Sequence, residues 1–203
     1  MLADDFFLVA HHDVTGRGRL SHHAVSLGLA AGLLGELLSA DVIRLTGDDL
    51  VVLGGGRPEN LLGAAVFSEV AAERVVQPVP VWLAFLAQSS YARVGDRLAR
   101  AGRLEVRRRL GRVSYVPVSM NDAALPAALL SQKLRRNQFL DFADVCLAGL
   151  VLATGLDRFL LDGAGPEASA RLEWYVSHSW PPMRSLVDHT QAAVGKAVLA
   201  HRS

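Results

Sequence analysis

The sequence predicts a mainly α-helical protein: a helical bundle around a central apolar helix, with one or two small β-hairpins. Apolar residues recur at helical spacing over several long stretches, which glycine- and proline-containing segments separate. Hydrophobic residues make up 51% of the 203 residues, so a sizeable core is available without disulfides or a structural metal. The sequence contains no internal repeat or convincing linker, and its length fits one domain over residues 1–203.

The segment Ser21–Ala40 is the expected central helix. Apolar residues repeat every four positions from Val25 to Leu37, and glycines and alanines stand between them. Ser21 is a typical N-cap residue. Each helical glycine costs about 1 kcal/mol relative to alanine. Close packing against neighbouring helices would offset that cost, so we expect other helices to surround this one.

The other expected elements follow from the same patterns. Two apolar runs, Val42–Leu45 and Leu50–Leu53, flank a Thr-Gly-Asp-Asp turn and predict a hairpin. We expect the remaining elements at Pro58–Val70 (helix), Pro80–Ala101 (helix), Leu104–Leu110 with Arg112–Val118 (second hairpin), Asp122–Leu140 (helix), Asp141–Leu161 (helix), and a last helical region after Gly163–Gly165 that Trp180-Pro-Pro182 interrupts. Because Asp141–Leu161 is apolar nearly all round, we expect it in the middle of the bundle.

Positive charge is concentrated between Arg93 and Arg112. Eight arginines and two acids give this segment a net charge of +6, whereas the whole chain carries +1. In the expected helix, the arginines share one face and apolar side chains share the opposite face, so we expect the guanidinium groups to face solvent. The candidate anion-binding residues are Arg93, Arg97 and Arg100 on the helix and Arg107, Arg108, Arg109 and Arg112 on the hairpin.

This basic segment has more than one interpretation. A solvated face, partly neutralised by acids elsewhere, is the simplest. Near anionic lipid, each basic side chain contributes about 1 kcal/mol, and the planar fork of arginine pairs well with phosphate. Leu110, at the expected hairpin tip, would then be a membrane-contact residue. A helix followed by a basic hairpin is also similar to a winged helix, so a regulatory or protein-interaction module that binds nucleic acid remains the alternative.

Other candidate sites have weaker support. The histidine pairs His11-His12 and His22-His23 lack the spacing of a metal site. A GxGxxA pattern begins at Gly163, but a helical run precedes it where a dinucleotide fold requires a strand. The sequence contains no GxSxG elbow and no P-loop. We therefore expect no metal, no cofactor and no enzymatic activity. Cys146 stands in an apolar run, and we expect a reduced thiol in the core.

The N-terminus and the composition bear on location and source. Asp4 and Asp5 stand where a signal peptide carries positive charge. No apolar run reaches the ~20 residues of a spanning helix. We therefore expect a cytoplasmic protein, which lipid binding would bring to the cytoplasmic face of a membrane. Nineteen of the 21 basic residues are arginine, which together with abundant alanine, leucine and glycine suggests a bacterial source.

Several short segments occur in an order that is informative. They include the start Leu2-Ala-Asp-Asp-Phe-Phe-Leu-Val-Ala10, then Leu27–Leu37 with its Glu-Leu pair, then Trp82-Leu83 and Val94–Gly102 before the hairpin. This series, from Leu2 to Leu161, resembles the Golgi phosphoprotein 3 (GPP34-type) family, especially its short bacterial branch. The resemblance implies a helical bundle with an inserted hairpin. It also implies peripheral membrane binding through a phosphoinositide headgroup, phosphatidylinositol 4-phosphate in the eukaryotic members.

The resemblance further implies an adaptor role in the eukaryotic members, which hold glycosyltransferases in the Golgi, and a hairpin used for membrane contact or self-association. The family binds the headgroup through a tryptophan, an arginine and two paired basic residues, and these positions correspond here to Ser21, to Ala30, and to Ala92 and Gly95. Arg93 lies between the last two as a displaced substitute. Arg97-Leu98 matches the Arg-Leu pair of the family. The eukaryotic headgroup pocket is therefore not reproduced. We expect a peripheral protein that binds phosphoinositide or other anionic lipid through its basic helix face and hairpin.

Overall fold

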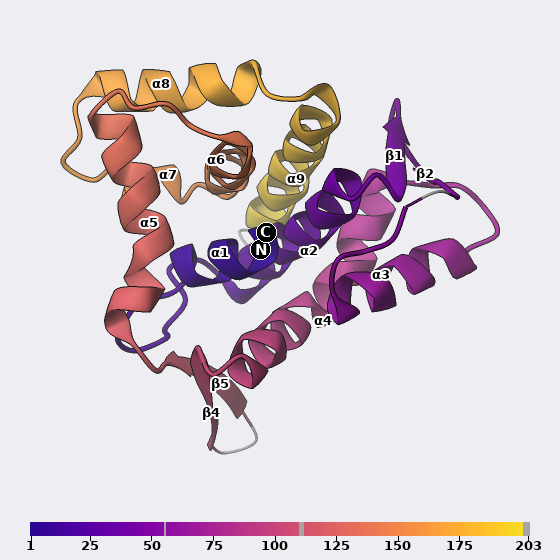
Figure 1. Cartoon of the computed structure of the whole chain (residues 1–203), viewed down its shortest axis with the longest axis horizontal. Coiled ribbons are helices and arrows are strands. Elements are labelled where there is room, and N and C mark those ends of the chain that lie inside the picture. Colours follow the sequence, from indigo (N-terminus) through magenta and orange to yellow (C-terminus); the bar gives the residue numbers. More distant parts are fainter. Residues whose placement is uncertain (55, 110–111, 201–203) are drawn as a thin grey trace.

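The computed structural model describes residues 1–54, 56–109 and 112–200, and it confirms a mainly helical fold with two small antiparallel sheets (Figure 1). The helices are α1 (Leu2–Val9), α2 (His22–Ser39), α3 (Leu61–Ala72), α4 (Val79–Arg100), α5 (Met120–Arg135), α6 (Phe142–Thr154), α7 (Asp157–Leu160), α8 (Pro166–Ser177) and α9 (Pro181–Ala200). The strands are β1 (Ile43–Thr46), β2 (Asp49–Val52), β3 (Gln77–Pro78), β4 (Leu104–Arg109) and β5 (Arg112–Pro117).

Helix α2 forms the centre of the bundle, as predicted. Its side chains are buried along most of its length, and α1, α4, α6 and α9 pack around it. A Cβ atom at Gly28 would lie only 2.2 Å from the ring of Phe6, and one at Gly32 would lie 2.9 Å from the Cα atom of Ala3. These glycines therefore allow α1 to approach α2 closely. The predicted N-cap is also confirmed, because Oγ of Ser21 accepts a hydrogen bond from the N–H of Ala24 at 3.2 Å.

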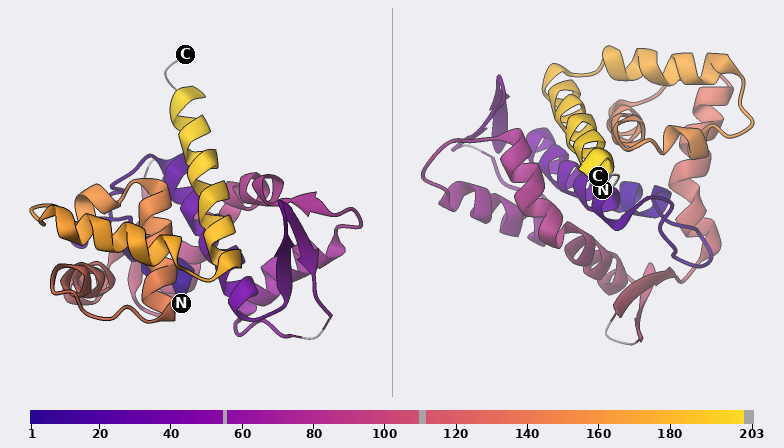
Figure 2. Two further views of the ribbon diagram at one scale, coloured as in Figure 1. Left: turned by 90° about the horizontal axis from the view of Figure 1, so that it is seen from above. Right: turned by 180° about the vertical axis from the view of Figure 1, so that it is seen from behind.

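Helix α1 was not expected as a helix from the sequence. It contains eight residues, and a helix this short is marginal in isolation. Nearly all its side chains are buried against α2, α5 and α6, so tertiary packing stabilises it. Figure 2 shows that α9, by contrast, extends past the neighbouring helices toward its C-terminal end.

Three helix boundaries differ from the prediction. Helix α3 begins at Leu61 and not at Pro58, because Oδ1 of Asn60 accepts a hydrogen bond from Gly63 at 2.9 Å and caps the helix. Helix α5 ends at Arg135, five residues before the expected end. The predicted helix over Asp141–Leu161 is two helices, because Gly155 adopts φ +78° and terminates α6. Helix α6 lies among α1, α2, α8 and α9, inside the bundle as predicted.

Both predicted hairpins are present. Strands β1 and β2 pair from Ile43↔Val52 to Thr46↔Asp49, and the short strand β3 joins β2 as a third strand that the sequence did not reveal. Strands β4 and β5 form the second hairpin, which projects from the C-terminal end of α4 (Figure 1). Within the described ranges, no helix has both the length and the apolar character needed to span a membrane.

Candidate functional site

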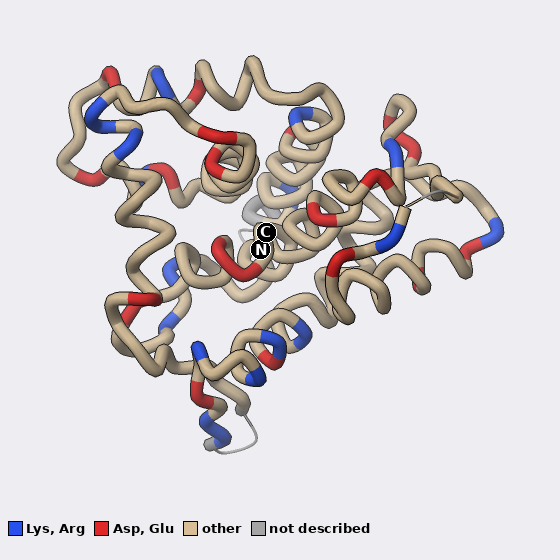
Figure 3. Tube along the Cα trace, viewed as in Figure 1, with Lys and Arg blue, Asp and Glu red and all other residues tan. Residues whose placement is uncertain are grey.

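The basic end of the molecule, defined as the C-terminal half of α4 together with the β4–β5 hairpin, is the candidate site. Figure 3 shows basic residues, all of them arginines in this segment, gathering along this part of the chain. The hairpin is anchored by Tyr115, whose ring lies against Gly95 and whose hydroxyl donates to Asp96 at 2.8 Å. The same hydroxyl also lies 3.2 Å from the carbonyl oxygen of Ala92. These contacts fix the hairpin against α4, so the arginines of the two elements keep a fixed arrangement.

Arg97 is buried at this end of the molecule, and the prediction that it faces solvent is wrong. The residue is only 9% exposed. Its Nε donates to Asp4 at 2.8 Å, and Nη1 and Nη2 each donate to Glu36 at 3.1 Å. Helical spacing places Arg93, Arg97 and Arg100 on one side of α4. Part of that side faces solvent, whereas the part that carries Arg97 contacts α1 and α2. The two carboxylates there offset the cost of burying the guanidinium group.

The ion cluster of Asp4, Glu36, Asn60 and Arg97 connects four helices. Nη1 of Arg97 also donates to Oδ1 of Asn60 at 3.2 Å, and the N–H of Ala3 donates to Glu36 at 3.0 Å. Burial raises the pKa of Asp4, and the charge of Arg97 reverses only part of that effect. Burial lowers the pKa of Arg97, but the hydrogen bonds and charges of Glu36 and Asp4 outweigh it and raise that pKa overall. The guanidinium of Arg97 therefore stays charged and binds partners inside the protein.

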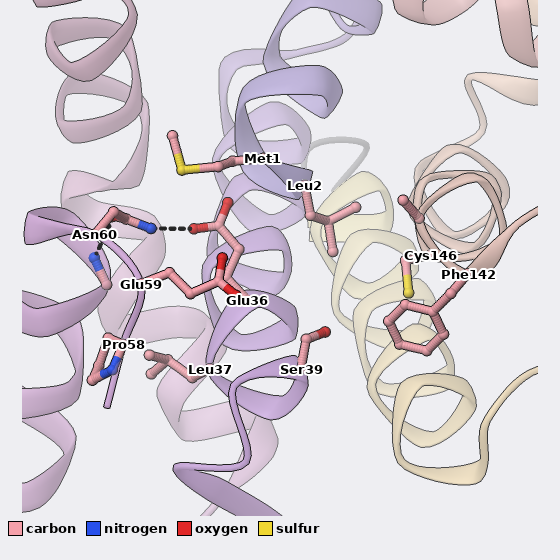
Figure 4. A pocket seen from close by; sticks show the side chains of 12 residues that line it. Met1, Leu2, Glu36, Leu37, Ser39, Pro58, Glu59, Asn60, Phe142 and Cys146 are labelled. Atoms are coloured by element: carbon pink, nitrogen blue, oxygen red, sulfur yellow. Dashed lines mark hydrogen bonds between the residues drawn. The ribbon is translucent and has the colours of Figure 1, made fainter. Parts of the chain in front are cut away.

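A cavity of about 340 Å³ lies beside this cluster. Figure 4 shows Glu36 and Ser39 on the α2 side, Glu59 near the start of α3, and Phe142 and Cys146 on the α6 side. Burial raises the pKa of Cys146 to about 11, as expected for the predicted core thiol. Glu36 and Glu59 are the carboxylates of its lining, which also includes Met1.

The remaining arginines differ in their partners. Arg93 forms an ion pair with Glu69 at 2.9 Å, and Arg107 forms one with Glu105 at 3.0 Å. Among the described residues, no carboxylate lies within salt-bridge distance of Arg100, Arg103 or Arg108. Arg103 belongs to the basic segment but not to the predicted anion-binding residues, and it lies between α4 and β4. These unpaired guanidinium groups are the ones available to an external anion.

Exposed apolar side chains lie among these arginines. Val113 is 46% exposed and stands opposite Arg108 across the hairpin. Val118 is 65% exposed, and its N–H donates to the carbonyl oxygen of Arg103 at 3.0 Å. Val106 on β4 is also exposed. Positive charge and exposed apolar side chains therefore occur together at the hairpin.

Some of the predicted site residues lie at the hairpin end. The backbones of Arg109 and Arg112 pair with each other as the last residues of β4 and β5. Their side chains, and the whole of Leu110, lie outside the described residues.

The positions that correspond to the family's headgroup residues have structural roles here. Ser21 caps α2, and Ala30 is fully buried in the core. A Cβ atom at Gly95 would lie 2.5 Å from the ring of Tyr115, so any side chain at that position requires the ring to move. These three positions therefore serve the capping and packing of α2 and α4.

Comparison with known proteins agrees with the fold and with the order of the segments quoted above. A comparison with curated proteins gives no match. The family model for Golgi phosphoprotein 3 (GPP34) matches residues 2–198, which is nearly the whole chain and includes α1 through most of α9. The chain belongs to the Golgi phosphoprotein 3 (GPP34) family.

Proposed function

We propose that this protein is a non-catalytic, peripheral membrane protein that binds anionic phospholipid through the basic end of the molecule. The observation that carries the proposal is the set of unpaired arginines: Arg100 and Arg108 are exposed and Arg103 is half-buried, with Val113 opposite Arg108 and Val118 beside Arg103. Each guanidinium group near an anionic bilayer contributes about 1 kcal/mol. Apolar side chains at the same surface add binding energy when they enter the headgroup region. Family membership supports the same role.

The proposed recognition responds to surface charge and not to one phosphoinositide. Ser21, Ala30 and Gly95 occupy the positions where the family has the headgroup tryptophan and basic residues, and none of them presents a charged side chain. Phosphatidylinositol 4-phosphate is therefore one anionic lipid among several that the surface accepts. Such binding weakens as salt rises, because exposed charges are screened beyond about 10 Å at 0.1 M ionic strength.

Vesicle co-sedimentation tests this proposal. Neutral phosphatidylcholine vesicles are compared with vesicles given equal negative charge by phosphatidylglycerol or by phosphatidylinositol 4-phosphate. We expect binding to both anionic preparations, release at high salt, and little binding to neutral vesicles. Binding that is indifferent to anionic lipid at low salt would overturn the proposal. Retention of duplex DNA without vesicle binding would overturn it in favour of the nucleic-acid alternative.

A charge-matched pair of variants locates the binding surface. The triple variant Arg100→Gln/Arg103→Gln/Arg108→Gln removes the unpaired arginines, and at about 1 kcal/mol each we expect roughly a hundredfold weaker binding to anionic vesicles. The control triple variant replaces exposed arginines outside the basic end: Arg57→Gln, Arg74→Gln and Arg136→Gln. The control has the same net charge, so equal losses in both proteins would assign the binding to overall charge and not to this surface.

A further inference from the structure

A second cavity, of about 230 Å³, lies beside the connection between α1 and α2. It lies between the α1–α2 connection, helix α5 and helix α7. The α5 wall consists of small side chains, including Ala123, Ala124 and Ala127, which leave the space open. The same connection packs against the hairpin, because a Cβ atom at Gly16 would lie 2.0 Å from the carbonyl oxygen of Tyr115. The connection that lines the cavity therefore also contacts the hairpin.

Arg19 is the cation in this cavity, and its orientation is fixed. Its Nε donates to the carbonyl oxygen of His11 at 3.1 Å. Its Cζ atom lies 3.5 Å from the centroid of the Phe159 ring, so the ring supports one face of the guanidinium. Among the described residues, Nη1 and Nη2 have no hydrogen-bond acceptor. The guanidinium is thus held in place while its outer N–H groups remain available.

The charge of Arg19 is only partly compensated. The nearest carboxylate is that of Asp13, whose Oδ1 lies 4.0 Å from Nη2, beyond hydrogen-bond distance. That same oxygen lies closer to Nδ1 of His12, at 3.3 Å. Burial lowers the pKa of Arg19, and the charge of Asp13 raises it by a smaller amount. An oxyanion placed at Nη1 and Nη2 would therefore gain a strong, preoriented partner.

Resting on the proposed membrane binding, we infer that Arg19 binds the phosphate group of an anionic ligand in this cavity. Two phosphate oxygens match the fork of Nη1 and Nη2, and Phe159 keeps the guanidinium plane fixed for that contact. The alanine wall leaves room for a small organic group attached to the phosphate, such as glycerol. The ligand is a phosphate ester, which reaches the site either as a lipid headgroup or as a free molecule in solution.

The neighbouring Arg17 provides a matched comparison. It lies two residues away in the same connection and carries the same charge, but its side chain is exposed and does not line the cavity. If binding depended only on attraction to negative charge, Arg17 and Arg19 would contribute equally to it. A built phosphate site uses Arg19 alone.

The test measures two ligands with four variants of the full chain. Calorimetric titration with glycerol 1-phosphate reports the free ester, and co-sedimentation with phosphatidylglycerol vesicles reports the lipid. Arg19→Gln removes the cation and Arg17→Gln is its control. Ala127→Met fills the cavity while leaving Arg19 in place, and Ala65→Met, on the exposed face of α3, is its control. Thermal unfolding of every variant confirms that it is folded.

We expect Arg19→Gln and Ala127→Met each to weaken binding of the free ester by roughly tenfold, while both controls bind as the parent protein does. A larger loss of vesicle binding for Arg19→Gln than for Arg17→Gln identifies the lipid headgroup as the source of the phosphate. A selective effect on the free ester alone supports the site and assigns it to a soluble phosphate ester.

Equal changes in Arg19→Gln and Arg17→Gln would overturn the inference, as would unchanged ester binding by Ala127→Met. Absence of ester binding by the parent protein, with equal vesicle binding by Arg19→Gln and Arg17→Gln, would also overturn it. These outcomes leave the proposed function intact if vesicle binding still requires anionic lipid. Failure of the proposed function appears separately, as indifference of the parent protein to anionic lipid.

Discussion

Arg97 on α4 and Glu36 on α2 are joined by two hydrogen bonds of 3.1 Å, although 61 residues separate them in the chain. Both residues belong to segments that carry the family resemblance, the Glu-Leu pair of the central helix and the Arg-Leu pair of α4. Asp4, in the opening segment, completes the same cluster at 2.8 Å from Arg97. These family segments therefore meet in the interior, where they hold helices together, and not at the proposed lipid surface.

The first prediction concerns the stability that this cluster provides. Arg97→Met leaves the carboxylates of Asp4 and Glu36 buried without their cation, and we expect the free energy of unfolding to fall by about 3–5 kcal/mol. Urea denaturation measures the change. Arg100→Gln, one helical turn away but exposed, is the control and should alter stability by less than about 0.5 kcal/mol. Equal effects of the two variants would show that the cluster does not stabilise the fold.

The second prediction concerns pH and His11. Its ring is buried, Nδ1 lies 2.6 Å from the carbonyl oxygen of Phe7, and burial lowers its pKa to about 4. As pH falls, His11 takes up a proton in the unfolded chain before it does so in the folded protein. The contribution of the neutral His11 ring to the free energy of unfolding is therefore fully present above pH 6.5 and is lost as pH falls toward 4. The loss amounts to about 3 kcal/mol. Urea denaturation at a series of pH values should show this dependence, and it should be absent in His11→Phe.

The effect of His11 is the difference in unfolding free energy between the parent protein and His11→Phe, because the other titrating groups are present in both proteins. A difference in unfolding free energy that does not change between pH 6.5 and 4 would contradict it.

The third prediction concerns the anchoring of the hairpin. Gly95→Ala would place a methyl group 2.5 Å from the ring of Tyr115, so the ring must move. We expect a loss of about 1–3 kcal/mol in the free energy of unfolding. Gly195 in α9 is the matched control, because apart from its own helix no described residue comes within 4 Å of a Cβ atom there. Gly195→Ala should be neutral or stabilising by up to about 1 kcal/mol. Similar changes from both substitutions would argue against the packing of Tyr115 on Gly95.

The fourth prediction concerns Val118 in the proposed membrane contact. Val118→Asp adds a negative charge beside Arg103, and we expect roughly tenfold weaker binding to phosphatidylglycerol vesicles. Val75→Asp is the control, since Val75 is equally exposed, at 64%, but lies in the α3–β3 connection, away from the hairpin (Figure 1). Co-sedimentation compares the two. Equal loss of binding would mean that Val118 does not contact the bilayer.

Local patterns were sufficient to predict most of the elements. The central helix, both hairpins and the long helix before the second hairpin are correct, because apolar spacing, caps and turn residues act over a few positions. The pattern did not reveal α1 and β3, which are too short to show a period and exist through contacts with distant segments. The helix break at Gly155 was missed because the apolar run continues past it.

By itself, the sequence determined the fold class, the family segments and the concentration of positive charge between Arg93 and Arg112. Only the tertiary structure decided which of those charges reach solvent. Arg97 and Arg100 look equivalent on a helical wheel, yet Arg97 faces Asp4 and Glu36 in the interior while Arg100 is exposed. Burial of a charge depends on partners that the fold brings from other segments, and no local pattern encodes those partners. For the same reason, only the tertiary structure places Phe159 and the α5 wall beside Arg19.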